Sequence, residues 1–104
     1  MAQKESLQST HAWLAALAEQ FGVSPALVRS LVGDILQLTA DVAHNGPSRP
    51  AAPTTAFLVG LAAGQAGLPN DEAEQAEKVR ALIAQTSALL QRYGAENEGV
   101  DEQD

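Results

Sequence analysis

The sequence predicts an all-α fold, a small four-helix bundle with a rigid Pro-rich loop between the second and third helices. Alanine contributes 20 residues and leucine 13, and both lose little side-chain freedom in a helix. Residues that favour strands are scarce, with seven valines, two isoleucines and four aromatic residues. Apolar residues also recur at spacings of three and four in four separate segments. A chain of 104 residues has room for one such core.

The first helix is expected to begin at Ser9 or Thr10, since either side chain can cap free backbone N–H groups. Its apolar stripe follows at helical spacing: Leu14, Leu17, Ala18 and Phe21. Gly22 comes directly after this stripe, where a helix end commonly needs a left-handed residue. We therefore predict a flexible N-terminus over residues 1–8 and the helical bundle over residues 9–93.

The second helix is predicted over residues 25–44. Ser24 can cap it, and Pro25 suits the first helical position, where its missing N–H costs nothing. The apolar stripe consists of Val28, Leu31, Val32, Ile35, Leu38 and Val42. Gly33 in its middle costs about 1 kcal/mol relative to alanine, so the segment could be one helix or a short helix followed by a longer one.

Three prolines, Pro47, Pro50 and Pro53, lie between the second and third helices. Each fixes its own φ and biases the preceding residue toward extended backbone. We therefore expect a stiff, extended loop over residues 45–53. Thr54 or Thr55 is then expected to cap the third helix.

Small residues recur along the third helix at spacings of three and four: Gly60, Ala63, Gly64 and Gly67. This spacing fits no phosphate-binding loop or dinucleotide fingerprint, so we interpret it as room for another helix to approach closely. The large apolar side chains of this helix are expected to face one way: Phe57, Leu58 and Leu61. The helix should stop at Gly67 or at Leu68-Pro69.

Asn70 or Asp71 is expected to cap the fourth helix, with Glu74 as a capping-box partner of Asp71. Its long apolar stripe consists of Ala76, Val79, Leu82, Ile83, Thr86, Leu89, Leu90 and Tyr93. Gly94 is expected to end the helix. Residues 94–104 hold five of the thirteen acidic residues and no base, which predicts a disordered acidic tail that accounts for most of the net charge of −7.

Several function classes are excluded by what the sequence lacks. Without cysteine there is no disulfide, thiolate nucleophile or sulfur-based metal site. No apolar segment resembles a signal peptide or reaches the roughly 18 residues of a membrane span. We expect a cytoplasmic protein without a membrane contact. Neither histidine lies at a spacing from carboxylates that would enclose a metal ion, so we predict no metal site. We also predict no cofactor and no catalytic residue.

Residues 17–31 are similar to the helix-turn-helix of bacterial repressors, with Gly22 at the turn. Affinity for duplex DNA comes largely from Lys and Arg on phosphates, whereas Arg29 is the only base in this stretch. Any tight corner between two helices has the same pattern for packing reasons. DNA binding is therefore the third of our functional hypotheses.

The most distinctive stretch is residues 41–64: DVAHNGPSRPAAPTTAFLVGLAAG. Its Asp, Ala-His, Arg-Pro, Ala-Pro, paired Thr and Phe-Leu-x-Gly-Leu-Ala elements resemble a small actinobacterial domain of unknown function. That domain occurs alone or fused to a nucleotidyltransferase-like domain of molybdopterin–guanine dinucleotide biosynthesis. The resemblance covers roughly residues 10–90 and implies a link to molybdenum-cofactor metabolism, with a nucleotidyltransferase of that pathway as a partner.

Five residues in this stretch are candidates for binding a small anionic ligand: Asp41, His44, Arg49, Thr54 and Thr55. Asp41 and His44 share a helix face, and the threonines sit where a helix start can hold a phosphate or carboxylate. The simpler interpretation is structural: Arg49 pairs with Asp41 and pins the loop, while one threonine caps the helix.

Taken together, these observations favour a small helical accessory or interaction module without catalytic activity of its own. Anionic-ligand binding at the loop is the alternative. So many alanines make a thin core, because burying alanine contributes far less than the ~1.5–3 kcal/mol of a leucine or phenylalanine. We therefore expect a homodimer, formed through the Leu82/Leu89 edge or the Gly60–Gly64 face. The competing outcome is a monomer that buries both surfaces.

Overall fold

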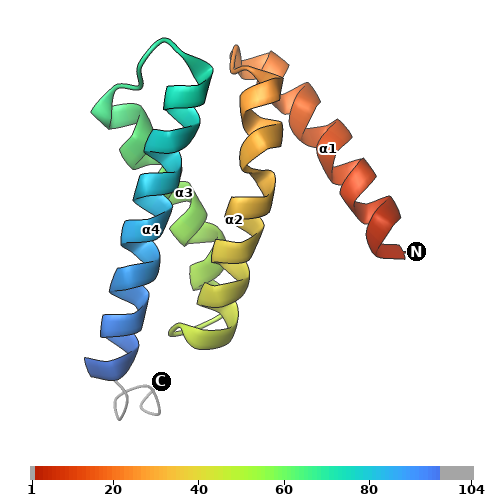
Figure 1. Ribbon diagram of the computed structural model, residues 1–104. Helices are drawn as coiled ribbons and strands as arrows, with labels where there is room; N and C mark the ends of the chain where they lie inside the picture. The colour runs from red at the N-terminus through yellow and green to blue at the C-terminus, as the bar shows by residue number, and fades with distance from the viewer. Residues whose placement is uncertain (1, 97–104) are drawn as a thin grey trace. The chain divides into compact units, whose positions relative to one another are not determined.

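A computed structural model describes residues 2–96, and the side chains of residues 7–93. Four helices follow one another: α1 (Ala2–Phe21), α2 (Pro25–Asn45), α3 (Ala51–Ala66) and α4 (Glu72–Glu96) (Figure 1). The described residues contain no strand, so the predicted all-α class is confirmed. The chain divides into two compact units, Met1–Val32 and Gly33–Asp104, which are described one at a time.

The first unit holds α1 and the beginning of α2. α1 begins at Ala2, so the expected start at Ser9 or Thr10 is wrong. The residues before Ser9 are mostly good helix formers, and a serine or threonine inside a helix costs only a few tenths of a kcal/mol. The presence of Ser9 and Thr10, which are of a type that can cap a helix, therefore did not mark the start of α1.

The corner between α1 and α2 is built as the sequence predicts. Gly22 has a positive φ of 74° and donates its N–H to Glu19 O at 3.2 Å, while the Val23 N–H reaches Ala18 O at 2.8 Å. These two bonds form a Schellman motif, which satisfies the last carbonyls of α1. Ser24 Oγ then accepts the Leu27 N–H at 3.2 Å and caps α2. α2 is one continuous helix, which decides between the two alternatives left open by Gly33.

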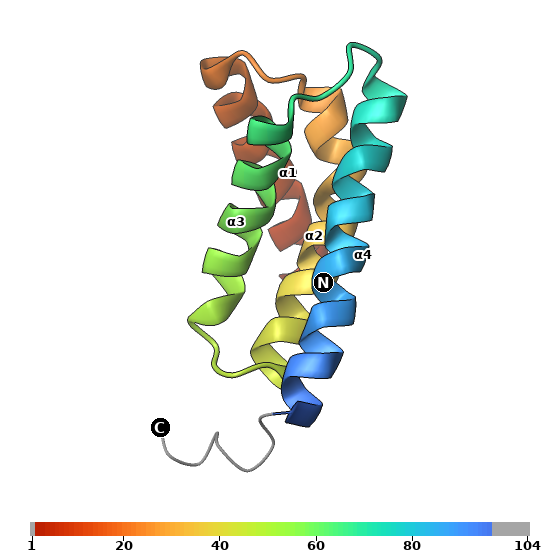
Figure 2. The same cartoon turned by 90° about the vertical axis from the view of Figure 1, so that its left-hand side faces the viewer.

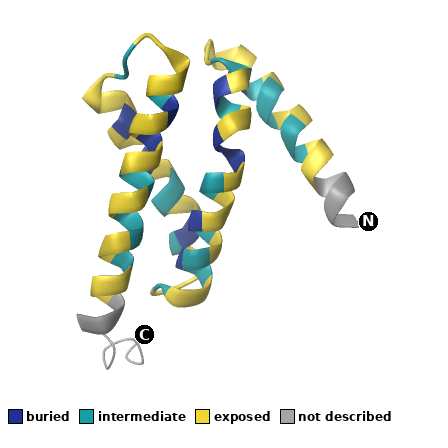
Figure 3. Cartoon of the chain, in the orientation of Figure 1, coloured by how far each residue is buried: buried dark blue, intermediate teal, exposed yellow. Residues whose placement is uncertain are grey.

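The second unit packs the later part of α2 with α3 and α4, and α3 lies against α4 (Figure 2). Its buried apolar residues are Leu38, Val42, Ala52, Val59, Ala63, Ala76 and Val79 (Figure 3). Leu38 is the only large side chain among the described residues that is fully buried. Gly46 admits no side chain, because a Cβ there would lie 2.5 Å from Val42 O and 3.2 Å from Leu90 Cδ1. The core is therefore narrow and rich in alanine.

The connection between α2 and α3 is shorter than expected. α3 begins at Ala51 and places Pro53 in its first turn, so the loop does not extend to residue 53. Proline is tolerated there because the first N–H groups of a helix have no intrahelical acceptor. The expected threonine cap is wrong as well: Thr54 Oγ1 donates to Pro50 O at 3.1 Å and to Ala51 O at 3.0 Å, and no side chain caps α3.

The ends of α3 and α4 were predicted with mixed success. α3 stops at Ala66 before Gly67, which has a φ of 79°. Asp71 Oδ2 accepts the Glu74 N–H at 3.1 Å, so Asp71 is the N-cap of α4. α4 continues through Gly94 to Glu96, and the end expected at Gly94 is wrong. The predicted acidic tail lies, from residue 97 onward, outside the described residues.

Candidate functional site

The five candidate residues of the sequence lie on α2, on the α2–α3 connection and in α3. Asp41 accepts a hydrogen bond from Gln37 Nε2, one turn earlier on α2, at 3.1 Å. Arg49 is exposed and forms no ion pair with Asp41 in the described part of the chain. His44 is exposed in the last turn of α2. The expected Arg49–Asp41 pair is therefore wrong, since Gln37 is the nearer partner along the helix.

The start of α3 also offers fewer N–H donors than an anion site needs. The Ala51 N–H donates to Ser48 O at 3.2 Å, and the Ala52 N–H donates to Arg49 O at 3.0 Å. Pro53 has no N–H. Helix starts bind anions through free N–H groups, and here the first groups are already used. Ligand binding by these residues stays a prediction without this support.

Three exposed large apolar side chains of the second unit lie close together in the sequence on α3. Phe57 is 65% exposed, Leu58 60% and Leu61 45%. The buried side of the same helix is formed by smaller residues: Ala52, Val59 and Ala63. At about 100° per residue the three large side chains therefore share one exposed side of α3, opposite the side that packs. We call the surface formed by Phe57, Leu58, Gly60, Leu61 and Gly64 the α3 outer face.

Two glycines of the α3 outer face serve no packing within the second unit. A Cβ added at Gly60 or at Gly64 would meet no atom within 4 Å. No helix of the second unit approaches these glycines, so the predicted close approach of another helix is not met within this unit. Sequence reasoning placed the three large side chains on one side of this helix, but it did not predict which side packs, because Phe57 and Val59 look equally suited to a core. The available signal was the lack of polar residues: between residues 56 and 64 every side chain is apolar or absent.

A groove lined by residues of α3 and α4 adjoins this surface at Leu58. Its volume is about 630 Å³, and Leu58 belongs to both the groove and the α3 outer face. Leu89 of α4, itself 53% exposed, lines the opposite wall. Arg92 supplies the only charged side chain of the lining. The groove and the α3 outer face share Leu58, but the other α3 residues of the groove lie on a different side of the helix from Gly60 and Gly64.

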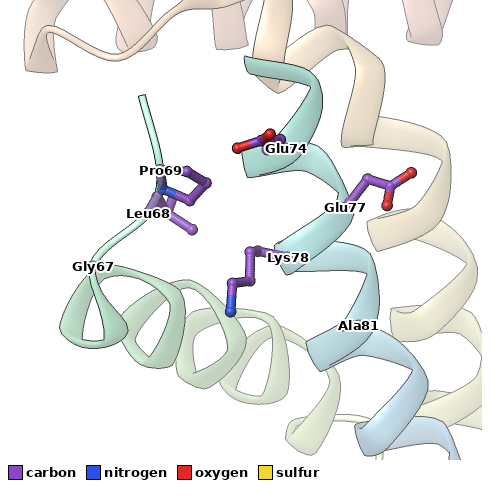
Figure 4. A pocket seen from close by; sticks show the side chains of 7 residues that line it. All are labelled: Gly67, Leu68, Pro69, Glu74, Glu77, Lys78 and Ala81. Atoms are coloured by element: carbon purple, nitrogen blue, oxygen red, sulfur yellow. The ribbon is translucent and has the colours of Figure 1, made fainter. Parts of the chain in front are cut away.

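A second hollow, of about 610 Å³, lies between the α3–α4 connection and the first turns of α4 (Figure 4). Glu74 and Lys78 extend toward the connection, whereas Glu77 points away from it (Figure 4). Gln75 Nε2 donates to Pro69 O at 2.6 Å and ties the connection to the helix. One carboxylate and one ammonium beside a shallow apolar wall do not define a reaction. No group of three or more metal-ligating side chains occurs among the described residues.

The first unit contains a small cavity of about 70 Å³ beside His11. His11 Nδ1 is buried and has no hydrogen-bond partner among the residues that the structure describes. Arg29 lines the same cavity and remains the one basic residue of the stretch similar to a helix-turn-helix.

Trp13 and Phe21, two aromatic residues of α1, are exposed. Exposed aromatic rings without flanking bases favour protein contacts over phosphate contacts.

These features define a small all-α domain with an exposed apolar face on α3. The sequence matches the domain of unknown function DUF6457 over residues 5–98, and the chain belongs to this family. No curated protein and no solved structure matches the chain. In the described part of the chain, no helix has the length and apolar character needed to cross a membrane.

Proposed function

We propose that this chain is a protein-interaction module, and that the α3 outer face is its binding surface. The observation that carries the proposal is that α3 is apolar on all sides while only one side is buried. A helix that is hydrophobic all round normally lies inside a larger assembly. Its polar side chains are confined to Thr54, Thr55 and Gln65. A covering protein surface accounts for this distribution.

The free energy gained by burying these side chains supports the same conclusion. Burying an exposed leucine or phenylalanine side chain stabilises a complex by up to about 1.5–3 kcal/mol. Phe57, Leu58 and Leu61 each leave about half or more of their surface in water. Aromatic anchors surrounded by aliphatic side chains are typical of the energetic centre of protein interfaces. In the part of the chain that the structure describes, no set of polar side chains converges in an arrangement that suggests catalysis.

A photo-crosslinking amino acid placed at Phe57 tests this proposal in cells that produce the native protein. Benzoylphenylalanine resembles the side chain it replaces, and position 57 is open to solvent. We expect a protein adduct on irradiation. The matched control carries the same group at Glu77, an exposed position of α4, and should give none. Absence of an adduct at position 57, or equal adducts at both positions, would contradict the proposal.

A narrower proposal is that the module acts beside a nucleotidyltransferase of molybdenum-cofactor biosynthesis in the cytoplasm. Its support is the resemblance of residues 41–64 described above. The test is co-purification of the chain with such an enzyme, followed by titration of the two purified proteins. A saturable interaction is expected. Absence of binding at high micromolar concentrations would reject this partner without touching the interaction surface itself.

A further inference from the structure

We propose that the first unit binds a small carboxylate, of the size of acetate, between His11 of α1 and Arg29 of α2. The site lies within Met1–Val32 and goes beyond the proposed function, because it shares no residue with the α3 outer face. Three observations support it: a buried ring nitrogen without a protein partner, a cavity beside it, and the positive charge at that cavity.

The buried nitrogen is Nδ1 of His11. It is shielded from solvent and has no hydrogen-bond partner among the described residues. Burying a polar atom without a partner costs free energy, and native structures supply a partner for most such atoms. His11 lines the cavity of about 70 Å³, so a small molecule in this cavity can supply the missing partner.

The volume of the cavity limits the size of the ligand. One water molecule takes roughly 30 Å³ of the liquid, so a cavity of about 70 Å³ holds about two waters or one organic ion of three or four non-hydrogen atoms. Apart from His11 and Arg29, the lining side chains are apolar: Leu14, Ala15, Pro25, Val28 and Val32. A nucleotide or a sugar is too large for this site.

The polar groups of the cavity favour a ligand that only accepts hydrogen bonds. Arg29 has N–H donors and no acceptor, and an imidazole with its hydrogen on Nδ1 donates there as well. A carboxylate accepts from both side chains and has no hydrogen of its own to place. A water molecule that accepts from both would direct its two hydrogens at apolar side chains, where they find no partner.

The charge around the cavity also favours an anion. Arg29 forms no ion pair in the described part of the chain, and no lining residue is acidic. Pro25 places the cavity beside the first turn of α2, which holds no acidic residue to complement the positive end of the helix dipole. Arg29 is exposed, so a small ion can enter beside it. The chain as a whole has a net charge of −7 and repels anions, which makes these local groups the source of any affinity.

NMR on the full chain tests the inference, with the imidazole nitrogens of His11 as the probe. Sodium benzoate is replaced stepwise by sodium acetate, so that pH and ionic strength stay fixed and only the smaller carboxylate fits the cavity. We expect a saturable shift of His11 Nδ1 with a midpoint of about 1 mM, since four non-hydrogen atoms cannot bind more tightly than roughly 40 μM. His44, the other histidine, should not respond. Acetamide, which has the shape of acetate without its charge, should cause no shift.

Two variants separate the two side chains of the site. Arg29→Gln removes the charge and should weaken acetate binding by at least about tenfold. Arg92→Gln is the matched control: it changes an exposed arginine of α4 outside the cavity and should bind acetate as the wild type does. His11→Leu should stay folded and lose the rise in melting temperature that acetate gives the wild type.

Three results would overturn the inference. The first is a His11 shift that acetamide or benzoate causes as strongly as acetate. The second is the lack of any saturable shift well above the expected midpoint, which would leave water as the partner of His11 Nδ1. The third is an Arg29→Gln variant that binds acetate with undiminished affinity. None of these results bears on crosslinking at position 57, so the proposed function is tested separately.

Discussion

Arg80 Nε donates a hydrogen bond to Asp34 Oδ2 at 3.0 Å, and this ion pair joins α4 to the later part of α2. The two residues are 46 positions apart in the sequence. Their side chains are 46% and 41% exposed, so water and salt screen the attraction. The pair therefore contributes little to the stability of the fold.

The first prediction concerns the strength of this pair. In a double-mutant cycle of Asp34→Ala and Arg80→Ala, we expect a coupling free energy below about 1 kcal/mol, because exposed ion pairs gain little in water. The coupling should fall further in high salt. Urea unfolding at two salt concentrations measures it. A coupling of several kcal/mol that does not respond to salt would contradict the assignment of the pair as solvent-screened.

The second prediction concerns the core of the second unit. Leu38 is 1% exposed, whereas Leu36 on the same helix is 46% exposed. Leu38→Ala should lower the free energy of unfolding by about 2–5 kcal/mol, since it removes buried methyl groups and leaves a cavity. Leu36→Ala is the matched control and should cost less than about 1 kcal/mol. Equal losses in chemical denaturation would mean that the burial pattern of α2 is wrong.

Local chemistry made the helix ends near Gly22, Ser24, Gly67 and Asp71 predictable from the sequence. Each of these ends is fixed by bonds to residues within five positions, so the sequence contains both partners. The start of α1 was missed because Ser9 is compatible with a helix interior as well as with a cap.

The candidate surface was harder to predict, because it depends on contacts between distant residues. α3 is apolar on every side, so no periodicity indicates which side packs. The structure buries Val59 and exposes Phe57, although both side chains are hydrophobic. In its described part, the structure does not contain the predicted Arg49–Asp41 pair; the hydrogen-bond partner of Asp41 is Gln37, one turn earlier on the same helix.

The third prediction follows from the exposed position of Arg49. Arg49→Ala should change the free energy of unfolding by no more than about 0.5 kcal/mol, as is usual for surface substitutions. Thermal unfolding of the variant and the wild type measures the difference. The control is Asp71→Ala, which removes the α4 cap seen at 3.1 Å and should cost about 1 kcal/mol. A large loss on Arg49→Ala would restore a structural role for this residue in pinning the loop.

The last prediction compares the effect of an alanine substitution at two glycines, Gly33 and Gly22. Gly33 lies inside α2, has no positive φ, and a Cβ there would meet no atom within 4 Å. Gly33→Ala should therefore stabilise the protein by about 0.5–1 kcal/mol, because alanine restricts the unfolded chain and favours the helix. Gly22 has equal space around it but a φ of 74°. Gly22→Ala forces an L-residue into the left-handed region, so it should destabilise by about 1–2 kcal/mol. Denaturant unfolding of both variants measures the difference, and effects of the same sign would show that space, rather than backbone conformation, decides at these positions.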